Sequence, residues 1–268
     1  MPSELELIQQ LRRRMPDSPL GDDCAVIPHG PGEDLLFTTD FLIEDVHFRR
    51  RGRSAADIGY RALARSLSDI AAIGGEPRWA MLALALPPWA TRRWIDGFYE
   101  GFLELAKEYG TTLIGGDLSH TEKLIADVMV CGVAPRGQAL PRSGARVGDA
   151  IYVSGELGRG RWRFVPQVAL GRKLRESGAA TACMDVSDGL AIDLHRMCVE
   201  SGVAAELDSF RASWNRGEDY ELLFTLRPGA RAPRGAIRLG RIVAGEPGRI
   251  TCGGREIPPV GYDHFRGS

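Results

Sequence analysis

The chain has 268 residues, which is long enough for one large domain or two modest ones with a substantial core. Its 34 basic and 35 acidic residues give a formal net charge of −1. This balance argues against a general nucleic-acid-binding protein, which usually carries a basic excess. Because Lys107, Lys123 and Lys173 are the only lysines, mechanisms that need a catalytic lysine have almost no candidates.

The cysteines and the apolar runs exclude further classes. Five scattered cysteines without a C-x-x-C pair do not indicate a disulfide framework or a structural zinc site. The longest apolar run, residues 79–86, stops at Pro87 and is far too short to span a bilayer. The charged segment 1–14 predicts an amphipathic helix and not a signal peptide. We therefore expect a cytoplasmic protein with reduced thiols, whose partner is neither a membrane nor a nucleic acid.

Strand and helix signals alternate through the first half of the chain. Ser54 begins a long helix with a capping-box-like Ser-x-x-Asp start, and Gly74-Gly75 ends it. Thr91 caps a second helix, whose apolar residues share one face and which ends at Gly110. The strands predicted around these helices cover residues 35–39, 78–86, 111–114 and 124–133.

A stretch rich in proline, glycine and arginine, residues 135–149, indicates a domain junction. We therefore predict two domains of the α/β and α+β classes, residues 1–137 and residues 138–268. The elements predicted for the second are strands at 151–154, 182–186 and 220–226, helices at 167–177 and 188–201, and a hairpin at 249–257 that turns at Gly253-Gly254.

Aspartates follow the predicted strands at positions that suit a metal site. Asp40, Asp117 and Asp185 each come directly after an apolar strand, and Asp188 follows shortly after the last of them. Open α/β sheets bind ligands beyond the carboxyl ends of their strands, so we expect these carboxylates to converge with the Asp22-Asp23 pair. Cations must compensate such a cluster. An aspartate after a strand is also a common turn former or helix cap, which explains any one position equally well.

Hydroxyl side chains and one helical aspartate strengthen the prediction of a metal. Thr38, Thr39 and Ser187 lie beside the strand-end aspartates, and hard oxygen ligands of this kind suit Mg²⁺. Asp69 falls in the last turns of the helix that begins at Ser54, where the helix dipole disfavours a negative charge. Simple exposure to solvent is the alternative for Asp69, but a helix end directed at bound metal explains it better.

The usual nucleotide-binding signatures are absent from the sequence. No Gly-Lys dipeptide occurs, which excludes a Walker A loop, and Met197 after His195-Arg196 excludes a protein-kinase catalytic loop. Gly115-Gly116-Asp117 after a strand offers backbone N–H groups to a phosphate, although this signal alone is weak. Any phosphoryl transfer must therefore rely on metals, backbone and arginines.

Ordered segments along nearly the whole chain carry a resemblance to a known family: GDDCAVI (21–27), TTDFLIEDVHF (38–48), SLSDIAAIGGEP (66–77), IGGD (114–117), RSGARVGD (142–149), MDVSDGL (184–190), GEDYELLF (217–224) and GYDHF (261–265). With these segments the chain resembles the thiamine-monophosphate kinases, within the superfamily that includes aminoimidazole ribonucleotide synthetase. Single segments are shared across the superfamily. The full set, with GEDYELLF and GYDHF, is specific to the thiamine enzymes.

The resemblance implies a fold, a reaction and a set of site residues. The fold would be an N-terminal α/β domain with a mixed sheet that forms a homodimer, followed by an α+β domain, with the nucleotide in the cleft between them. The reaction would phosphorylate thiamine monophosphate to thiamine diphosphate, with ATP as co-substrate and several Mg²⁺ ions. Matched by position, the metal ligands are Asp23, Thr38, Thr39, Asp40, Asp69, Asp117, Asp185 and Asp188, the ATP contacts are Tyr99, Gly116, Arg142 and Ser187, and the thiamine contacts are His47, Glu218 and Tyr262.

This reaction needs no general base. The acceptor is a phosphate monoester whose second pKa, about 6, leaves it mostly dianionic at neutral pH. The barrier lies in bringing two polyanions together in line, which Mg²⁺ ions and arginines assist by neutralising charge and by positioning. We expect direct in-line transfer without a phosphoenzyme.

Two segments of the second domain are shorter than the family pattern. Residues 159–164 (RGRWRF) lead quickly to Pro166, and residues 208–216 stand where a longer loop and helix are expected. In addition, Asn215-Arg216-Gly217 stands where the family pattern has Gly-Gly before Glu-Asp-Tyr. Both segments fall near the expected thiamine end, so they bear on substrate affinity and on Glu218 more than on ATP or Mg²⁺.

Three other functions remain compatible with parts of the pattern. A sister enzyme could use the same ATP site on another acceptor, such as an aminoimidazole precursor, selenide or a maturation-factor carboxamide, although Cys24 is misplaced for selenide chemistry. A metal-dependent phosphohydrolase would share the acidic cluster, and a non-catalytic protein could bind ATP without turnover. Individual residues also have ordinary structural interpretations: His47 in a strand, Tyr99 in the core, Arg142 at the surface and Tyr262 packing the tail.

Overall fold

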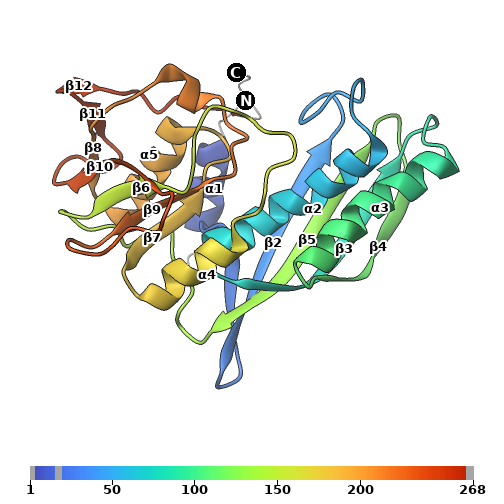
Figure 1. Ribbon diagram of the computed structural model, residues 1–268, viewed down its shortest axis with the longest axis horizontal. Coiled ribbons are helices and arrows are strands. Elements are labelled where there is room, and N and C mark those ends of the chain that lie inside the picture. Colours follow the sequence, from blue (N-terminus) through green and yellow to red (C-terminus); the bar gives the residue numbers. More distant parts are fainter. Residues whose placement is uncertain (1–3, 16–19, 264–268) are drawn as a thin grey trace.

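The computed structural model describes residues 4–15 and 20–263, whose first half forms a mixed sheet (Figure 1). The strands are β1 (Ala25–His29), β2 (Glu33–Ile43), β3 (Glu76–Leu86), β4 (Thr112–His120) and β5 (Ile125–Pro135). They lie in the order β1-β2-β5-β3-β4. Only β3 and β4 are parallel neighbours in this sheet, and the other pairs are antiparallel.

Two long helices, α2 (Ala55–Ala72) and α3 (Arg92–Glu108), cover one face of this sheet (Figure 1). Their predicted starts are confirmed, because the side chains of Ser54 and Thr91 accept hydrogen bonds from backbone N–H groups of the first turn. The helices approach each other closely through glycine. A Cβ atom at Gly59 would lie 1.9 Å from the carbonyl oxygen of Phe98. This packing holds α2 rigidly over β2, which is where the site forms.

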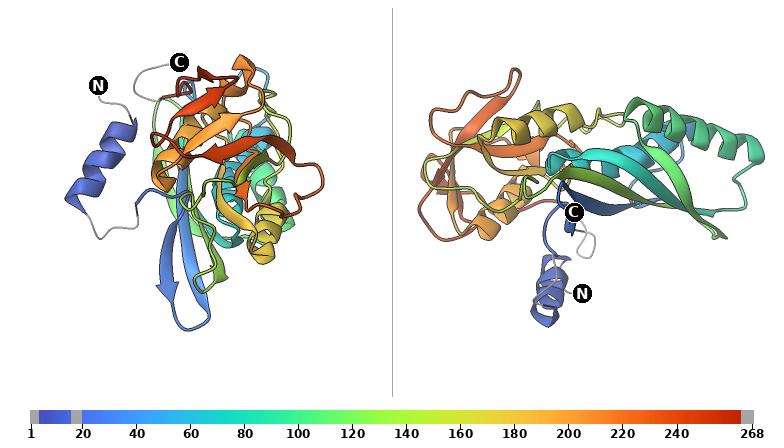
Figure 2. Two further views of the ribbon diagram at one scale, coloured as in Figure 1. Left: turned by 90° about the vertical axis from the view of Figure 1, so that its left-hand side faces the viewer. Right: turned by 90° about the horizontal axis from the view of Figure 1, so that it is seen from below.

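The opposite face of the sheet has neither α2 nor α3 over it (Figure 2, right-hand view), and it is exposed and partly apolar. Side chains alternate along each strand, so Leu42 and Leu82 are buried under the helices. Phe41, Trp79 and Met81 point the other way and are 51%, 42% and 38% exposed. An apolar face of this kind is typical of an interaction surface.

A second mixed sheet forms the other half, in the order β12-β11-β8-β10-β6-β9-β7. Helix α4 (Val168–Ser177) packs on β7 and on α2, and α5 (Leu190–Ser201) packs against β7, β8 and β11. A short 3-10 helix, η1 (Ala212–Asn215), lies against α5. The strands are β6 (Ala150–Val153), β7 (Ala180–Asp185), β8 (Ala204–Leu207), β9 (Leu222–Leu226), β10 (Ile237–Val243), β11 (Ile250–Cys252) and β12 (Arg255–Glu256). Two mixed sheets with helices therefore confirm the predicted fold class.

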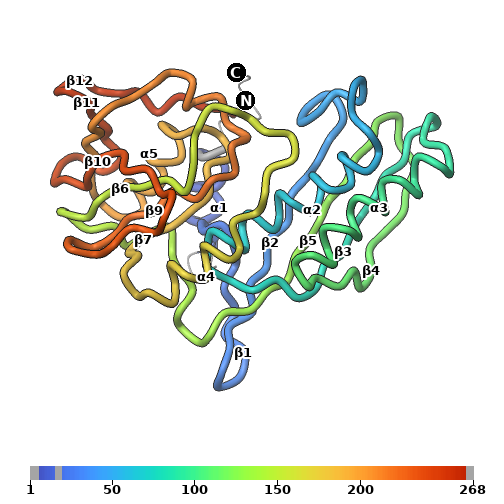
Figure 3. Tube along the Cα trace, in the orientation of Figure 1, coloured from blue at the N-terminus to red at the C-terminus, as the bar shows by residue number. Residues whose placement is uncertain are grey.

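Helix α2 belongs to both halves. Its last residues, Ala71 and Ala72, pack in one buried cluster with Leu174 and Phe224 of the second half. A Cβ at Gly171 of α4 would lie 1.9 Å from the carbonyl oxygen of Ala71, so the two helices touch through backbone. The predicted boundary between residues 137 and 138 falls in the connection from β5 to β6, which can be followed along the trace in Figure 3. The shared helix fixes how the two halves face each other.

The amino-terminal helix α1 (Glu4–Arg14) stands away from the rest of the molecule (Figure 2). Its formation confirms the predicted helix, apart from residues 1–3, which lie outside the described part of the chain. Arg12 joins it to α5 through an ion pair with Glu200 at 2.5 Å. Within the described ranges, none of the helices is both long enough and apolar enough to cross a membrane.

Two predicted strand ends are wrong. Asp40 and Asp117 lie inside β2 and β4, which continue to Ile43 and His120. Pairing with long neighbours extends both strands, because β5 accompanies β2 and β3 accompanies β4 beyond the aspartates. Asp185 does end β7, as predicted. The final residues of the GYDHF segment, 264–265, lie outside the described residues.

Candidate active site

A pocket of about 640 Å³ lies between the two halves. One side is formed by β2 and α2, and the other by the segments at 185–196 and 216–220. Its volume is within the range of small-molecule sites. Most of the predicted site residues line it: Asp23, Thr38, Thr39, Asp40, His47, Asp69, Arg142, Asp185, Ser187, Asp188, Glu218 and Tyr262.

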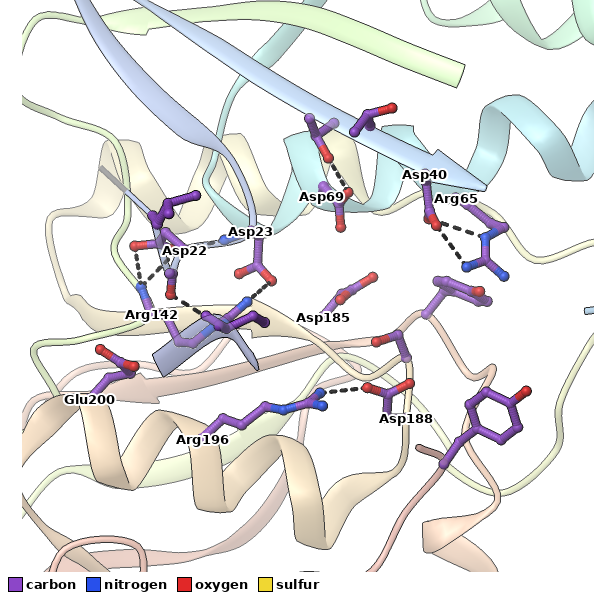
Figure 4. A pocket seen from close by; sticks show the side chains of 18 of the residues that line it. Asp22, Asp23, Asp40, Arg65, Asp69, Arg142, Asp185, Asp188, Arg196 and Glu200 are labelled. Atoms are coloured by element: carbon purple, nitrogen blue, oxygen red, sulfur yellow. Dashed lines mark hydrogen bonds and ion pairs between the residues drawn. The ribbon is translucent and has the colours of Figure 1, made fainter. Parts of the chain in front are cut away.

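Three carboxylates point toward one another in this pocket (Figure 4). One oxygen atom from each of Asp23, Asp69 and Asp185 lies within 4.8 Å of the others. Asp69 comes from the last turn of α2, Asp185 from the end of β7 and Asp23 from the segment before β1. Hydroxyl groups orient two of them, since Thr38 donates to Asp69 and Ser68 donates to Asp185.

Burial, and then repulsion between neighbouring carboxylates, raises the affinity of Asp69 and Asp185 for protons. Burial, followed by the charges of Asp185, Asp40 and Asp23, raises the pKa of Asp69 well above its ordinary value. Burial and then Asp23 likewise raise the pKa of Asp185. Asp22 has its pKa raised to about 6 by burial and by Asp23. Protons or cations therefore stabilise the cluster at neutral pH.

The donor set fits the Mg²⁺ that the family resemblance implies. Oδ2 of Asp23 is buried and has no hydrogen-bond partner among the described residues, while its Oδ1 is held by Arg142 at 2.6 Å. A buried carboxylate oxygen without a partner is unfavourable unless a cation meets it. Carboxylate and hydroxyl oxygens are also the ligands that Mg²⁺ prefers.

Arginines surround the acidic cluster, and the sequence interpretation missed most of them. Arg65 pairs with Asp40 at 2.7 Å, and Arg196 pairs with Asp188 at 2.5 Å. A signal for Arg65 was present, because it lies four residues before Asp69, so the two side chains share one face of the predicted helix. Arginine side chains suit the recognition of phosphate groups. The pocket thus offers both cation ligands and cationic side chains.

The predicted thiamine contacts lie in the same pocket. Nδ1 of His47 accepts a hydrogen bond from the backbone N–H of Ile43 at 3.0 Å, which places the imidazole proton on Nε2. Glu218 has a left-handed backbone conformation, with φ of 58°, and faces the pocket. Tyr262 is held by its backbone N–H, which donates to the carbonyl oxygen of Asp188 at 3.0 Å.

The shortened segment 159–164 is anchored beside Glu218. The carboxylate of Asp219 accepts hydrogen bonds from the N–H groups of residues 158–160 at 2.7 to 3.1 Å. The guanidinium groups of Arg53 and Arg61 lie 4.2 and 4.4 Å from the centre of the Trp162 ring. Arg61 is 1% exposed and reaches Glu218 at 3.1 Å. The GEDYELLF motif therefore places one carboxylate at the pocket and uses the next to hold the short loop.

Three predicted residues lie outside this pocket in the single chain. Tyr99 sits on α3 and packs edge-on against Phe98, at 5.9 Å between ring centroids. Gly116 and Asp117 lie within β4, and Asp117 lines a small separate pocket with Phe41 on the exposed face of the sheet. Within one chain, the described structure does not bring these three residues to the acidic cluster.

Comparisons with known proteins agree with this geometry. The family model described as AIR synthase related protein, N-terminal domain, matches residues 21–134. A thiamine-monophosphate kinase of Rhodopirellula baltica is 36% identical over 241 residues, which cover 78% of this chain and 76% of that protein. The thiamine-monophosphate kinase of Aquifex aeolicus is 30% identical over 305 residues, which cover 98% of each chain.

The same similarity is found among solved structures. A structure described as AaThiL complexed with AMPPCP and TMP superposes with a TM-score of 0.86 at 29% identity, and the match covers 98% of this chain and 97% of that chain. The match to the Aquifex aeolicus sequence and the match to this structure each cover 98% of this chain. The chain therefore belongs to the thiamine-monophosphate kinase family.

Proposed function

We propose that this protein transfers the terminal phosphoryl group of ATP to thiamine monophosphate and so forms thiamine diphosphate. The observation that carries the proposal is the convergence of the acidic cluster, Arg142 and the predicted thiamine contacts in one pocket. Membership of the family and the full-length similarity support the same reaction. The reaction would be a direct in-line transfer without a phosphoenzyme.

Asp23, Asp69 and Asp185 are the residues that we propose to hold Mg²⁺. A bound Mg²⁺ neutralises phosphate charge and aligns the reacting groups. The Asp69 carboxylate is oriented by Thr38 and the Asp185 carboxylate by Ser68, so the protein fixes these ligands before metal arrives. The other predicted metal ligands remain predictions: Thr38, Thr39, Asp40, Asp117 and Asp188.

Further side chains of the pocket are proposed to bind ATP and thiamine monophosphate. Arg142, held in place by Asp23, and Ser187 are proposed to contact ATP. His47, Glu218 and Tyr262 are proposed to hold the thiamine part of the acceptor, whose positively charged ring suits a carboxylate such as Glu218. The acceptor phosphate is already mostly dianionic at neutral pH, so no side chain has to remove a proton from it.

An assay of the purified protein with Mg²⁺, ATP and thiamine monophosphate tests this proposal. We expect thiamine diphosphate to form with a matching amount of ADP, and we expect no phosphate to remain covalently attached to the protein. Chromatography of the thiamine compounds and mass spectrometry of the protein provide the two readouts. Absence of thiamine diphosphate, or a phosphoprotein that passes its phosphate to thiamine monophosphate, would contradict the proposal.

The same assay separates the alternatives. A phosphohydrolase would release inorganic phosphate from ATP whether or not thiamine monophosphate is present. A non-catalytic nucleotide-binding protein would bind ATP and give neither product. A sister enzyme would turn over ATP only with a different acceptor. The 98% mutual coverage with the Aquifex aeolicus thiamine-monophosphate kinase favours the thiamine acceptor over these.

We further propose a homodimer formed through the exposed face of the first sheet. Phe41, Trp79 and Met81 present apolar area there, and no helix of the described residues covers it. Asp117 lies on the same face, away from the acidic cluster of its own chain. A second copy packed against this face would give these side chains a partner and would cover the predicted residues in β4.

Replacing Phe41 by aspartate is expected to convert the dimer to monomer, because it places a charge among the apolar side chains of the proposed interface. Val165→Asp is the matched control, since Val165 is similarly exposed, at 61%, but lies in the second half. Light scattering coupled to gel filtration measures the mass of each variant. Equal masses for the wild type and Phe41→Asp would contradict the proposed interface.

A further inference from the structure

Asp40 differs from the carboxylates of the acidic cluster because one arginine engages both of its oxygens. Nε of Arg65 donates to Oδ2 at 3.1 Å, and Nη2 donates to Oδ1 at 2.7 Å (Figure 4). Such a bidentate pair is strong and fixes the geometry of both groups. Asp69 and Asp185 instead accept hydrogen bonds from hydroxyl groups, which carry no charge.

The surroundings hold Arg65 in this position. Its side chain is 10% exposed and projects from α2, which packs directly on β2, the strand that carries Asp40. The Tyr220 ring lies 5.8 Å from the guanidinium carbon on the side of the second half. A metal ion could use Asp40 fully only if the guanidinium withdrew, and a buried charged group that loses its partner is strongly unfavourable.

Arg65 also changes the charge that the pocket presents to a metal. It neutralises the charge of Asp40. Among the described residues, no cationic side chain neutralises Asp69 or Asp185, which accept hydrogen bonds from hydroxyl groups, and Oδ2 of Asp23 has no partner, so a cation still stabilises these three carboxylates. The guanidinium stands at the edge of the same pocket, with its charge fixed by the fold. A fixed cation needs no dehydration before it can act on a phosphate, unlike Mg²⁺.

We infer that Arg65 is a built-in cation of this site, which keeps Asp40 out of the set of metal ligands and supplies positive charge in place of a metal there. Before nucleotide arrives, the protein therefore binds a divalent ion through Asp23, Asp69 and Asp185, and Asp40 does not contribute. This inference rests on the metal site of the proposed function. It goes further by separating Asp40 from the other predicted ligands and by giving Arg65 a positioning role.

Binding of Mn²⁺ to the metal-stripped full chain, without nucleotide, tests the inference. Electron paramagnetic resonance of the free ion gives the affinity and the number of ions bound. We expect Asp40→Asn to leave the Kd for the tightest Mn²⁺ within about twofold of the wild type. Asp69→Asn should weaken it by at least about tenfold. Both substitutions preserve side-chain shape, so the comparison stands on well-matched variants.

Removing the Arg65 guanidinium should make Asp40 available as a metal ligand. Arg65→Met keeps the length of the side chain but frees Asp40, so an additional Mn²⁺ should bind, or a weak second one should tighten by about tenfold. The double variant with Asp40→Asn should lose that gain, as in a double-mutant cycle. Circular dichroism verifies the fold of each variant. If Arg65→Met does not fold, the comparison of Asp40→Asn with Asp69→Asn still shows whether Asp40 is a metal ligand.

Two results would overturn the inference, and they are distinguishable. If Asp40→Asn weakens Mn²⁺ binding as much as Asp69→Asn does, Asp40 is a metal ligand and this inference fails, while the three-carboxylate metal site of the proposed function stands. If Asp69→Asn has no effect, the three-carboxylate metal site fails, and the inference built on it fails as well. A difference of at least about tenfold between the two variants supports the inference.

Discussion

Replacing Asp69 by asparagine is expected to lower the formation of thiamine diphosphate about a thousandfold. Metal-ion stabilisation of a phosphoryl-transfer transition state contributes several kcal/mol, and each 1.36 kcal/mol changes a rate about tenfold. Asparagine keeps the shape of Asp69 and can still accept the hydrogen bond from Thr38, so the loss would come from the missing charge. Steady-state assays at saturating ATP and Mg²⁺ measure the effect.

The same substitution should raise the stability of the metal-free protein at neutral pH. The pKa of Asp69 is raised in the folded protein, first by burial and then by the neighbouring carboxylates. The folded state therefore binds a proton more readily than the unfolded state, in which the pKa is about 4. The stability of the folded state thus falls as pH rises from about 4 through the raised native pKa. The asparagine side chain carries no charge, so this loss would be absent from the variant.

Thermal unfolding in the presence of a chelator checks the stability effect. We expect a higher Tm for Asp69→Asn than for the wild type near neutral pH, and a smaller difference in acid. Asp96→Asn serves as the control, because Asp96 is exposed on α3 and its pair with Arg92 should contribute within about 0.5 kcal/mol. A lowered Tm, or near-normal turnover of Asp69→Asn, would mean that the acidic cluster is not a strained metal site.

Local signals are sufficient to predict the helices near the site. Ser54 and Thr91 stand at the starts of α2 and α3 because a side-chain oxygen followed by an apolar stripe is a short-range pattern. Gly202, with φ of 68°, ends α5 for an equally local reason. Asp185 can be placed at the end of a strand because β7 is short and buried.

The extent of the longer strands could not be predicted in the same way. Whether β2 continues past Asp40 depends on β5, which pairs with it up to Ile43 and lies far along the chain. Strands β8 and β10 were missed because β8 is only four residues long and Gly240 interrupts the pattern of β10 at a bulge. Strand ends are set by neighbours, and neighbours are a property of the fold.

The arginine partners of the site were hidden for a related reason. In a chain with so many arginines, no single one is distinguished by type. Arg65 and Arg61 are distinguished by position, since both lie on the buried side of α2 and are 8% and 1% exposed. Charged groups are almost never buried unless paired, so an arginine at an apolar helical position predicts a carboxylate opposite it. Asp40 and Glu218 are those carboxylates.

Replacing Arg61 by alanine is expected to have the second large effect, on both stability and the use of thiamine monophosphate. The Arg61 guanidinium donates to the carbonyl oxygen of Trp162 at 2.7 Å and pairs with Glu218 at 3.1 Å. Alanine would leave a cavity beneath the Trp162 ring and an unsatisfied carbonyl group. We expect a loss of about 2–4 kcal/mol in the free energy of unfolding.

The kinetic effect of Arg61→Ala should be confined to the use of the acceptor, thiamine monophosphate. Arg61 contacts the short loop and Glu218, whereas Arg142 pairs with Asp23 of the acidic cluster (Figure 4). We therefore expect KM for thiamine monophosphate to rise by at least about tenfold, which corresponds to 1.4 kcal/mol, with KM for ATP within about twofold. Initial-rate measurements with each substrate varied in turn separate the two constants.

Two further variants show whether Arg61 acts through the loop or through Glu218. Glu218→Gln removes the ion pair but leaves the bond to Trp162, so it should raise KM for thiamine monophosphate while costing less than about 1 kcal/mol of stability, because Glu218 is 43% exposed. Arg163→Ala is the matched arginine control: this side chain is 46% exposed and lies over Tyr60, so both KM values and the stability should stay close to the wild type.

If Arg61→Ala raised KM for ATP as much as KM for thiamine monophosphate, the assignment of Glu218 and the short loop to the thiamine end would be wrong. If Arg163→Ala matched Arg61→Ala, the effect would belong to the general positive charge of the segment and not to the buried contact of Arg61 with Trp162.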